Sequence, residues 1–174
     1  MSVIRVRPER PEDIPAITRV TELAFRAHPH SQQTEHFVIL ALRQAGALAV
    51  SLVAERDGEI VGHVAFSPVR ISDGSAHWYG LGPVAVLPER QGDGIGTALI
   101  EQGLSTLRAR GAAGCVVLGE PGYYGRFGFE ARADCVYEGV PPAYFQSLTL
   151  GASPAAGRVT YHDAFGATRE PDGG

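Results

Sequence analysis

Three glycines separated by single residues mark the stretch of this sequence that is best suited to bind a charged ligand. They occupy positions 92, 94 and 96 of the segment 91–97 (QGDGIGT). An apolar run over residues 81–86, typical of a buried strand, precedes them, and a segment with apolar residues at helical spacing follows. A strand, a glycine-rich turn and a helix in this order direct several backbone N–H groups outward at the positive end of the helix dipole. The segment therefore predicts a phosphate-binding site.

The glycine spacing excludes two common phosphate-binding motifs. The Walker pattern G-x-x-x-x-G-K-[ST] fails because no lysine follows Gly96. The dinucleotide fingerprint G-x-G-x-x-G fails because its last position is threonine or leucine, whichever glycine is taken as the first. What the segment does contain is Q-x-x-G-x-G, formed by Gln91, Gly94 and Gly96. Glycine-rich turns before helices are common, so this motif alone leaves an ordinary strand-to-helix turn open.

A pair of adjacent tyrosines forms the second candidate block. Tyr123 and Tyr124 lie in the segment 119–129 (GEPGYYGRFGF), which follows a β-like run at residues 115–118. Taken alone, two such tyrosines are more typical of half-buried packing with the hydroxyl groups in water.

Together the two blocks resemble the GNAT N-acetyltransferase superfamily, in particular its bacterial YhbS-like branch. The first block matches the superfamily's pyrophosphate-binding signature [QR]-x-x-G-x-[GA], and the second matches its Y-x-x-[LF]-G-F block. One expected helix and one expected strand separate them, and two such matches in the right order rarely coincide by chance. The order of the other expected elements also fits, so the resemblance covers about residues 2–165.

This resemblance implies a fold and a co-substrate. The fold is α/β with layered α+β character: a mixed, mostly antiparallel central sheet of six to seven strands, splayed at its central strand and flanked by about four helices. The co-substrate is acetyl-CoA, whose pyrophosphate lies on the glycine-rich turn and whose pantetheine arm pairs with the preceding strand, and no metal is expected. The implied cofactor-binding residues are Val84, Ala85, Val86, Gln91, Gly92, Asp93, Gly94, Ile95, Gly96, Thr97, Tyr124 and Phe127.

The implied reaction is transfer of an acetyl group to a primary amine of a small molecule or peptide, by direct attack in a ternary complex. By the resemblance, Tyr124 protonates the leaving thiolate and the backbone N–H of Val86 binds the oxyanion. Many relatives carry a catalytic carboxylate on the central strand, but residues 81–86 contain no acid. Glu120, at the end of the next strand, is our candidate base; a solvated glutamate with no catalytic role and a proton-carrying water chain stay open as alternatives. A CoA-binding sensor without turnover is the alternative function.

Asp93 departs from the superfamily pattern, because relatives commonly place arginine or lysine between the glycines. A carboxylate beside a pyrophosphate is unfavourable unless it points away or has a cationic partner. We expect Arg90 to restore part of the positive field.

Composition agrees with a cytoplasmic enzyme of one domain. We assign residues 1–165 to the acetyltransferase domain and residues 166–174 to a disordered tail. The net charge of −4 argues against a nucleic-acid partner. The apolar runs are too short to span a membrane, and the first residues show no secretory signal. Cys115 and Cys135 are expected as buried thiols, and the chain as a monomer or a homodimer.

The remaining elements follow from periodicity and turn residues. We expect a strand at residues 3–7, helices at 11–27, from 34 onward and at 94–110, and a hairpin of strands 50–56 and 59–71 around Asp57-Gly58. Pro83 inside the central strand predicts an edge or a bulge. Late strands are expected at 130–139, 146–150 and 158–162.

Three histidines could reach a substrate. For His28 and His30, in a polar connection between two helices, exposure in a loop is the favoured interpretation. His63 is more typical of a partly buried, hydrogen-bonded histidine, although its face of the strand could line the cleft.

Overall fold

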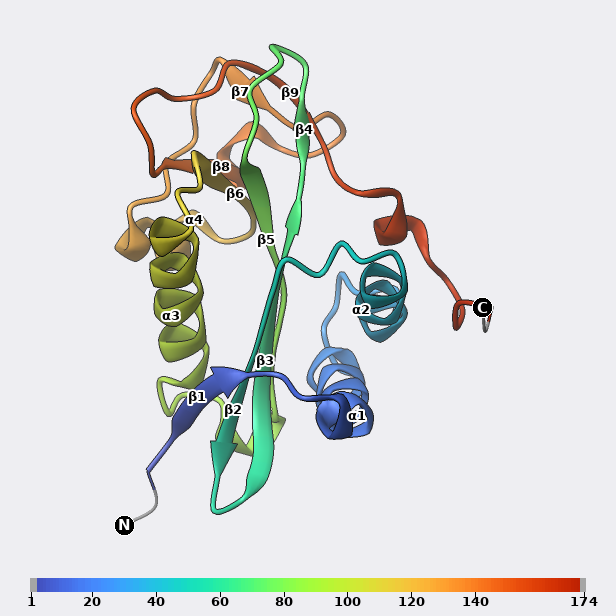
Figure 1. The fold of residues 1–174 in the computed structure, drawn as a ribbon. Helices are drawn as coiled ribbons and strands as arrows, with labels where there is room; N and C mark the ends of the chain where they lie inside the picture. Colours follow the sequence, from blue (N-terminus) through green and yellow to red (C-terminus); the bar gives the residue numbers. More distant parts are fainter. Residues whose placement is uncertain (1–2, 173–174) are drawn as a thin grey trace.

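A mixed sheet runs through the centre of the protein. Within residues 3–172, which the computed structural model describes, six strands form this sheet in the order β1-β2-β3-β5-β6-β8 (Figure 1). All neighbouring pairs are antiparallel except β5 and β6, which are parallel. Their bounds are Arg5–Pro8 (β1), Val50–Arg56 (β2), Glu59–Pro68 (β3), Trp78–Val86 (β5), Gly114–Leu118 (β6) and Phe145–Thr149 (β8).

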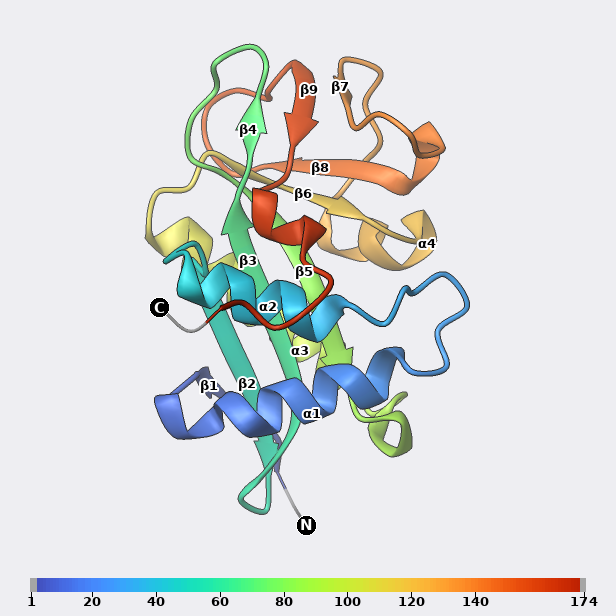
Figure 2. The same cartoon turned by 90° about the vertical axis from the view of Figure 1, so that its right-hand side faces the viewer.

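Helices cover both faces of this sheet. The helix α3 lies on one face, while α1 and α2 lie on the other, as Figures 1 and 2 show together. The short helix α4 follows β6 at the end of the sheet near α3 (Figure 1). The described part of the chain therefore has the mixed, mostly antiparallel sheet and the four α-helices that we expected. Their bounds are Ile14–Phe25 (α1), Glu35–Gln44 (α2), Ile95–Ala109 (α3) and Pro121–Tyr124 (α4).

A second, smaller sheet caps one end of the first. Its strands follow the order β4-β9-β7, with bounds Arg70–Ile71 (β4), Gly157–Thr160 (β9) and Cys135–Val136 (β7). We expected a single strand over residues 59–71, but the chain leaves the central sheet after β3 and forms β4. The strand expected at residues 130–139 shrinks to β7, preceded by an isolated bridge at Glu130. The strand expected at 158–162 is found as β9 in the small sheet, where it pairs with β4 and β7.

The turns and ends of elements follow local sequence rules. The hairpin of β2 and β3 turns at Asp57 and Gly58, which both have positive φ, as an Asp-Gly hairpin requires. Short 3₁₀ helices join other elements: Pro11–Asp13 (η1), Pro88–Arg90 (η2), Gly125–Phe127 (η3), Pro142–Tyr144 (η4) and Asp163–Gly166 (η5). No helix among residues 3–172 is long and apolar enough to cross a lipid bilayer.

The expected tail begins inside η5, and its described part runs beside α2 (Figure 2). Gln44 at the end of α2 donates a hydrogen bond to the backbone carbonyl of Asp172 at 2.6 Å. Residues 173 and 174 lie outside the described residues.

Strand β3 is the centre of the hydrophobic core. Eight of its ten residues are buried, because helices cover both of its faces. On the α3 face, Phe66 is completely buried and its ring fills the space that a side chain at Gly103 would need. The glycine therefore lets α3 approach the sheet closely.

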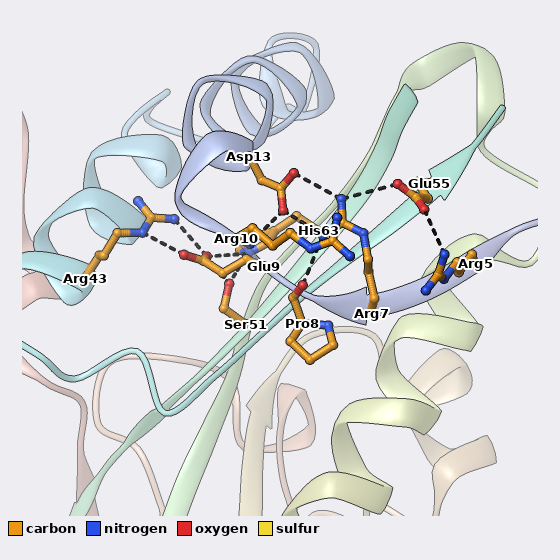
Figure 3. A network of polar contacts seen from close by, with 10 residues as sticks. All are labelled: Arg5, Arg7, Pro8, Glu9, Arg10, Asp13, Arg43, Ser51, Glu55 and His63. Carbon is orange, nitrogen blue, oxygen red and sulfur yellow. Dashed lines mark hydrogen bonds and ion pairs between the residues drawn. The ribbon is translucent and has the colours of Figure 1, made fainter. Parts of the chain in front are cut away.

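A network of charged and polar side chains ties β1, β2 and β3 to the helices on the opposite face (Figure 3). Arg7, only 9% exposed, donates two hydrogen bonds to Asp13 at 2.7 and 3.1 Å and one to Glu55 at 3.2 Å. This pairing holds the pKa of Asp13 below its usual range. The carboxylate of Asp13 also accepts the backbone N–H of Arg10 at 2.7 Å, which fixes the start of η1.

The same network continues to a buried histidine. Arg43 of α2 donates two hydrogen bonds to Glu9, at 2.9 and 3.0 Å, and Ser51 donates a further one to Glu9. The hydroxyl of Ser51 also lies 2.8 Å from Nε2 of His63. His63 has no exposed surface, and among the described residues its Nδ1 has no hydrogen-bond partner. Burial lowers the pKa of His63 from 6.5 to about 4, with opposite contributions from Glu9 and Arg43.

The first prediction concerns Gly103. An alanine at a helix interior normally stabilises by about 1 kcal/mol relative to glycine. We expect Gly103→Ala to destabilise instead, by about 1–3 kcal/mol, because its methyl group overlaps Phe66. Urea unfolding measures the change, with Ser105→Ala on the exposed face of α3 as the control. A Gly103→Ala protein as stable as the wild type would contradict this packing.

The second prediction concerns His63 and pH. Between about pH 6.5 and pH 4 the unfolded chain protonates this histidine while the folded protein does not. The unfolded state then binds more protons, so the free energy of unfolding decreases as the pH falls through this window. We expect His63→Gln to weaken that dependence and exposed His28→Gln to leave it unchanged, as measured by urea unfolding at pH 7 and pH 4.5. If the free energy of unfolding decreased equally between pH 7 and pH 4.5 in wild type and in His63→Gln, His63 would not be the source of this pH dependence.

Candidate active site

The central sheet opens between β5 and β6. Their parallel pairing covers residues 78–81 of β5 and residues 114–117 of β6, and ends there. Strand β5 continues to Val86, paired with β3 on its other side. The second half of β5 therefore has an edge that no neighbouring strand covers in the described structure, as expected for a sheet splayed at its central strand.

A bulge marks the point where this opening begins. Val64 of β3 lies opposite Val84 and Phe66 lies opposite Leu81, so β5 carries one extra residue between them. The Gly82-Pro83 peptide bond, which is cis, lies in this bulge. Pro83 has no N–H to donate to the ladder, and it lies in the bulge, where the pairing with β3 is interrupted.

The register of β3 and β5 determines where the backbone groups of β5 point. The N–H of Leu87 donates to the carbonyl of Val61 at 2.9 Å, so these residues form a hydrogen-bonded pair of the antiparallel ladder. Hydrogen-bonded and non-hydrogen-bonded pairs alternate along such a ladder. Val86 and Val84 are therefore non-hydrogen-bonded positions, whose N–H and C=O groups point away from β3 into the opening. Ala85 points its backbone groups towards β3.

The glycine-rich segment follows β5 as an irregular turn that leads into α3. Residues 91–94 form the turn, and the helix begins at Ile95. Gly92 and Gly94 have φ values of 91° and 80°, which only glycine adopts without strain. Gln91 donates from Nε2 to the carbonyl of Val86 at 3.2 Å, which connects the turn to the open edge of β5.

The start of α3 presents unpaired backbone donors. The first N–H that bonds back into the helix is that of Ala98, which donates to Gly94 at 3.0 Å. The N–H groups of Ile95, Gly96 and Thr97 precede it and have no intrahelical acceptor. The side chain of Ile95 is buried in the core, so its backbone is the part that can serve a ligand. These backbone N–H groups can donate hydrogen bonds to a phosphate group, as the sequence predicts.

Tyr123 and Tyr124 point to different surroundings, although they are adjacent in α4. The hydroxyl of Tyr123 lies 3.2 Å from Oγ1 of Thr97 and therefore joins α4 to the first turn of α3. The guanidinium of Arg126 stacks over its ring at 4.5 Å. The ring of Phe127, a half-buried residue of η3, lies 5.6 Å from that of Tyr123.

Tyr124 lies against the end of β6, beside the opening. Its ring fills the space next to Gly119, so that a side chain at Gly119 would overlap it. Burial raises the pKa of Tyr124 to about 12, so the hydroxyl keeps its proton at neutral pH. Among residues 3–172 this hydroxyl has no hydrogen-bond partner, and it is free to donate to a ligand. A protonated phenol at this place can act as a general acid.

Glu120 is exposed and directly precedes α4 at the same end of β6. Its backbone carbonyl accepts the N–H groups of Tyr123 and Tyr124 at 3.1 and 3.0 Å. The fold therefore brings Glu120 and Tyr124 to one side of the opening, while the Glu120 carboxylate lies in solvent.

Asp93 has a cationic partner that the sequence did not indicate. Asp93 forms an ion pair with Arg56 at the end of β2, with an Nη1–Oδ2 distance of 3.5 Å. Arg90, in η2, forms no ion pair with Asp93. Sequence reasoning missed Arg56 because no local motif connects residue 56 to residue 93; only the position of the hairpin in the folded sheet does.

The three histidines do not gather at the opening. His28 and His30 are exposed in the connection between α1 and α2, as favoured from the sequence, and their rings are 6.3 Å apart. His63 is completely buried in the network beside β2, so it presents no surface to a substrate. In the described part of the chain, no three His, Cys, Asp or Glu side chains gather in a way that could hold a metal ion.

Comparisons with known proteins give a consistent result. The family model described as the acetyltransferase (GNAT) domain matches residues 5–132. The N-acetyltransferase YhbS of Escherichia coli K12 is 34% identical over 168 residues, which cover 92% of this chain and 97% of YhbS. The E. coli N-acetyltransferase YjhQ is 35% identical over 157 residues, with 83% and 86% of the two chains covered.

Solved structures agree with this result. A GNAT-family acetyltransferase from Brucella melitensis, in complex with acetyl-CoA, superposes with a TM-score of 0.84 and 52% identity, covering 94% of this chain and 98% of the other. The structure of E. coli YhbS in complex with CoA gives a TM-score of 0.82, with 97% and 94% covered. The family match over most of the chain, together with these relatives, shows that this protein belongs to the GNAT acetyltransferase family.

Proposed function

We propose that this protein transfers an acetyl group from acetyl-CoA to a primary amine of a small molecule or peptide. One observation carries the proposal: the uncovered edge of β5 lies directly before a glycine-rich turn with free N–H groups. A pantetheine arm contains amide groups that can pair with such an edge like a neighbouring strand, and a diphosphate suits the turn. The acetyl-CoA and CoA complexes of the Brucella and E. coli proteins support this assignment.

The residues at the opening match the needs of the reaction. Val84 pairs with the pantetheine arm through its outward backbone groups, the N–H of Val86 faces the thioester, and the turn from Gln91 to Thr97 holds the diphosphate. The amine forms a bond to the thioester carbonyl carbon, whose oxygen then accepts a hydrogen bond from the N–H of Val86. When the carbon–sulfur bond breaks, Tyr124 gives its proton to the thiolate. The products are an amide and CoA.

The attacking amine must lose a proton, and Glu120 is our candidate to accept it. A free alkylammonium has a pKa near ~10, so at neutral pH a base or a water chain has to remove that proton. Glu120 lies at the same end of β6 as Tyr124, and its side chain is exposed to solvent. An exposed carboxylate there also attracts a cationic amine.

The third prediction tests the acid. Tyr124→Phe should lower kcat by about 100-fold or more, because a positioned general acid contributes that much, and should leave CoA affinity nearly unchanged. Thiol release from acetyl-CoA with a panel of amines measures the rate, and calorimetry measures CoA binding. Tyr123→Phe is the matched control and should retain most of the activity. Tight CoA binding with no amine-dependent thiol release by the wild type would instead support a non-catalytic CoA sensor.

The fourth prediction tests the base. Glu120→Gln should lower kcat/KM for the amine about 100-fold at neutral pH, without a change in the dissociation constant for CoA. The loss should shrink at pH above the pKa of the amine, where the amine is already neutral. Glu101→Gln, an exposed carboxylate on α3, is the control. Equal rates for Glu120→Gln and wild type would assign proton removal to water.

A further inference from the structure

An acidic side chain lies in the middle of the turn that the proposed function assigns to a diphosphate. Asp93 is flanked by Gly92 and Gly94, and its side chain is 48% exposed. A carboxylate near the first turn of a helix stabilises that helix, which gives Asp93 a role in the unliganded protein. The same negative charge repels a diphosphate that binds a few ångströms away. Something must offset this repulsion for the turn to function as an anion site.

The cation that approaches Asp93 comes from a distant part of the chain. Arg56 is the last residue of β2, and its Nη1 lies 3.5 Å from Oδ2 of Asp93. The Arg56 side chain is 25% exposed, so it is more restricted than a fully solvated arginine. The end of β2 and the turn after β5 lie at the same end of the sheet (Figures 1 and 2). This arrangement results from the antiparallel order of β2, β3 and β5.

We propose that Arg56 is a positioning residue for CoA. Its guanidinium holds the Asp93 carboxylate and neutralises it, so that the N–H groups of the turn meet the diphosphate without a competing negative charge. The inference rests on the proposed function, because it requires CoA to bind at this turn. It adds a residue from outside the glycine-rich motif, and it makes the β2–β3 hairpin part of the coenzyme site. Arg56 acts through Asp93 and does not itself contact the phosphates.

A double-mutant cycle on CoA binding tests this role. The dissociation constant is measured by calorimetry at low salt for wild type, Arg56→Gln, Asp93→Asn and the double variant. Arg56→Gln should weaken binding about threefold to tenfold, as expected for one uncompensated charge near an anion. Asp93→Asn should bind at least as tightly as wild type. In the Asp93→Asn background, Arg56→Gln should have almost no effect, because no carboxylate remains to be neutralised.

Three controls separate this role from general charge or folding effects. Arg56→Lys keeps the positive charge and should retain most of the affinity. Arg158→Gln removes a cation from another exposed ion pair, with Glu138 at 3.2 Å in the small sheet, and should not change CoA binding. At an ionic strength near 1 M, where the Debye length is about 3 Å, the difference between Arg56→Gln and wild type should shrink. Thermal unfolding of each variant confirms that it is folded.

Two results would overturn the inference. The first is an unchanged affinity for Arg56→Gln. The second is an equal loss of CoA affinity on Arg56→Gln in the wild-type and the Asp93→Asn proteins, which would mean that Arg56 contacts CoA directly. If that loss appeared with CoA but not with 3′-dephospho-CoA, the contact would lie at the 3′-phosphate. A wild-type protein that does not bind CoA at all would refute the proposed function. If the wild type binds CoA and all four proteins of the cycle have the same dissociation constant, only the role of Arg56 is refuted.

Discussion

The unpaired edge of β5 is the constraint on which the rest of the site depends. In an antiparallel ladder every second residue turns its backbone groups away from its partner strand, so Val84 and Val86 present theirs on the β6 side. Strand β6 stops pairing at the level of Leu81, so no described strand covers these groups, and the carbonyl of Val86 accepts a hydrogen bond from the side chain of Gln91. Exposed strand edges invite pairing by another chain. In the function that we propose, the amide groups of the pantetheine arm pair with this edge.

Several local features keep this edge open. The bulge at Gly82-Pro83 changes the course of β5 at the point where the pairing with β6 ends. At the end of β5, Gln91 donates a hydrogen bond to the carbonyl of Val86. At the end of β6, the ring of Tyr124 fills the space beside Gly119. Strand β3, buried on both faces, anchors the other side of β5. The two sides of the opening are thus fixed by different neighbours and do not collapse onto each other.

The sequence predicted what is local and missed what depends on register. The glycine-rich turn, the Asp57-Gly58 hairpin and the tyrosine block each lie within a few consecutive residues, whose types determine the conformation directly. The pairing of Asp93 with Arg56 and the path of residues 130–139 depend on which segments the tertiary fold brings together. Arg56 could not be foreseen because proximity in sequence does not decide which guanidinium a turn residue meets; the field that we expect from Arg90 stays a prediction.

Buried charge is concentrated at the β1–β2 edge of the sheet, which is separated from the opening between β5 and β6 by β3. Ion pairs join β1 and β2 to η1 and α2 through Asp13 and Glu9, and each of these carboxylates accepts bonds from an arginine. Breaking such a buried pair leaves an uncompensated charge in a low-dielectric interior, so this edge resists separation strongly. The β5–β6 junction is paired over four residues, and apolar side chains of both strands pack in the core clusters. The ion pairs therefore reinforce an edge of the sheet that takes no part in the proposed coenzyme site, and the opening beside β5 is left to the ligand that we propose.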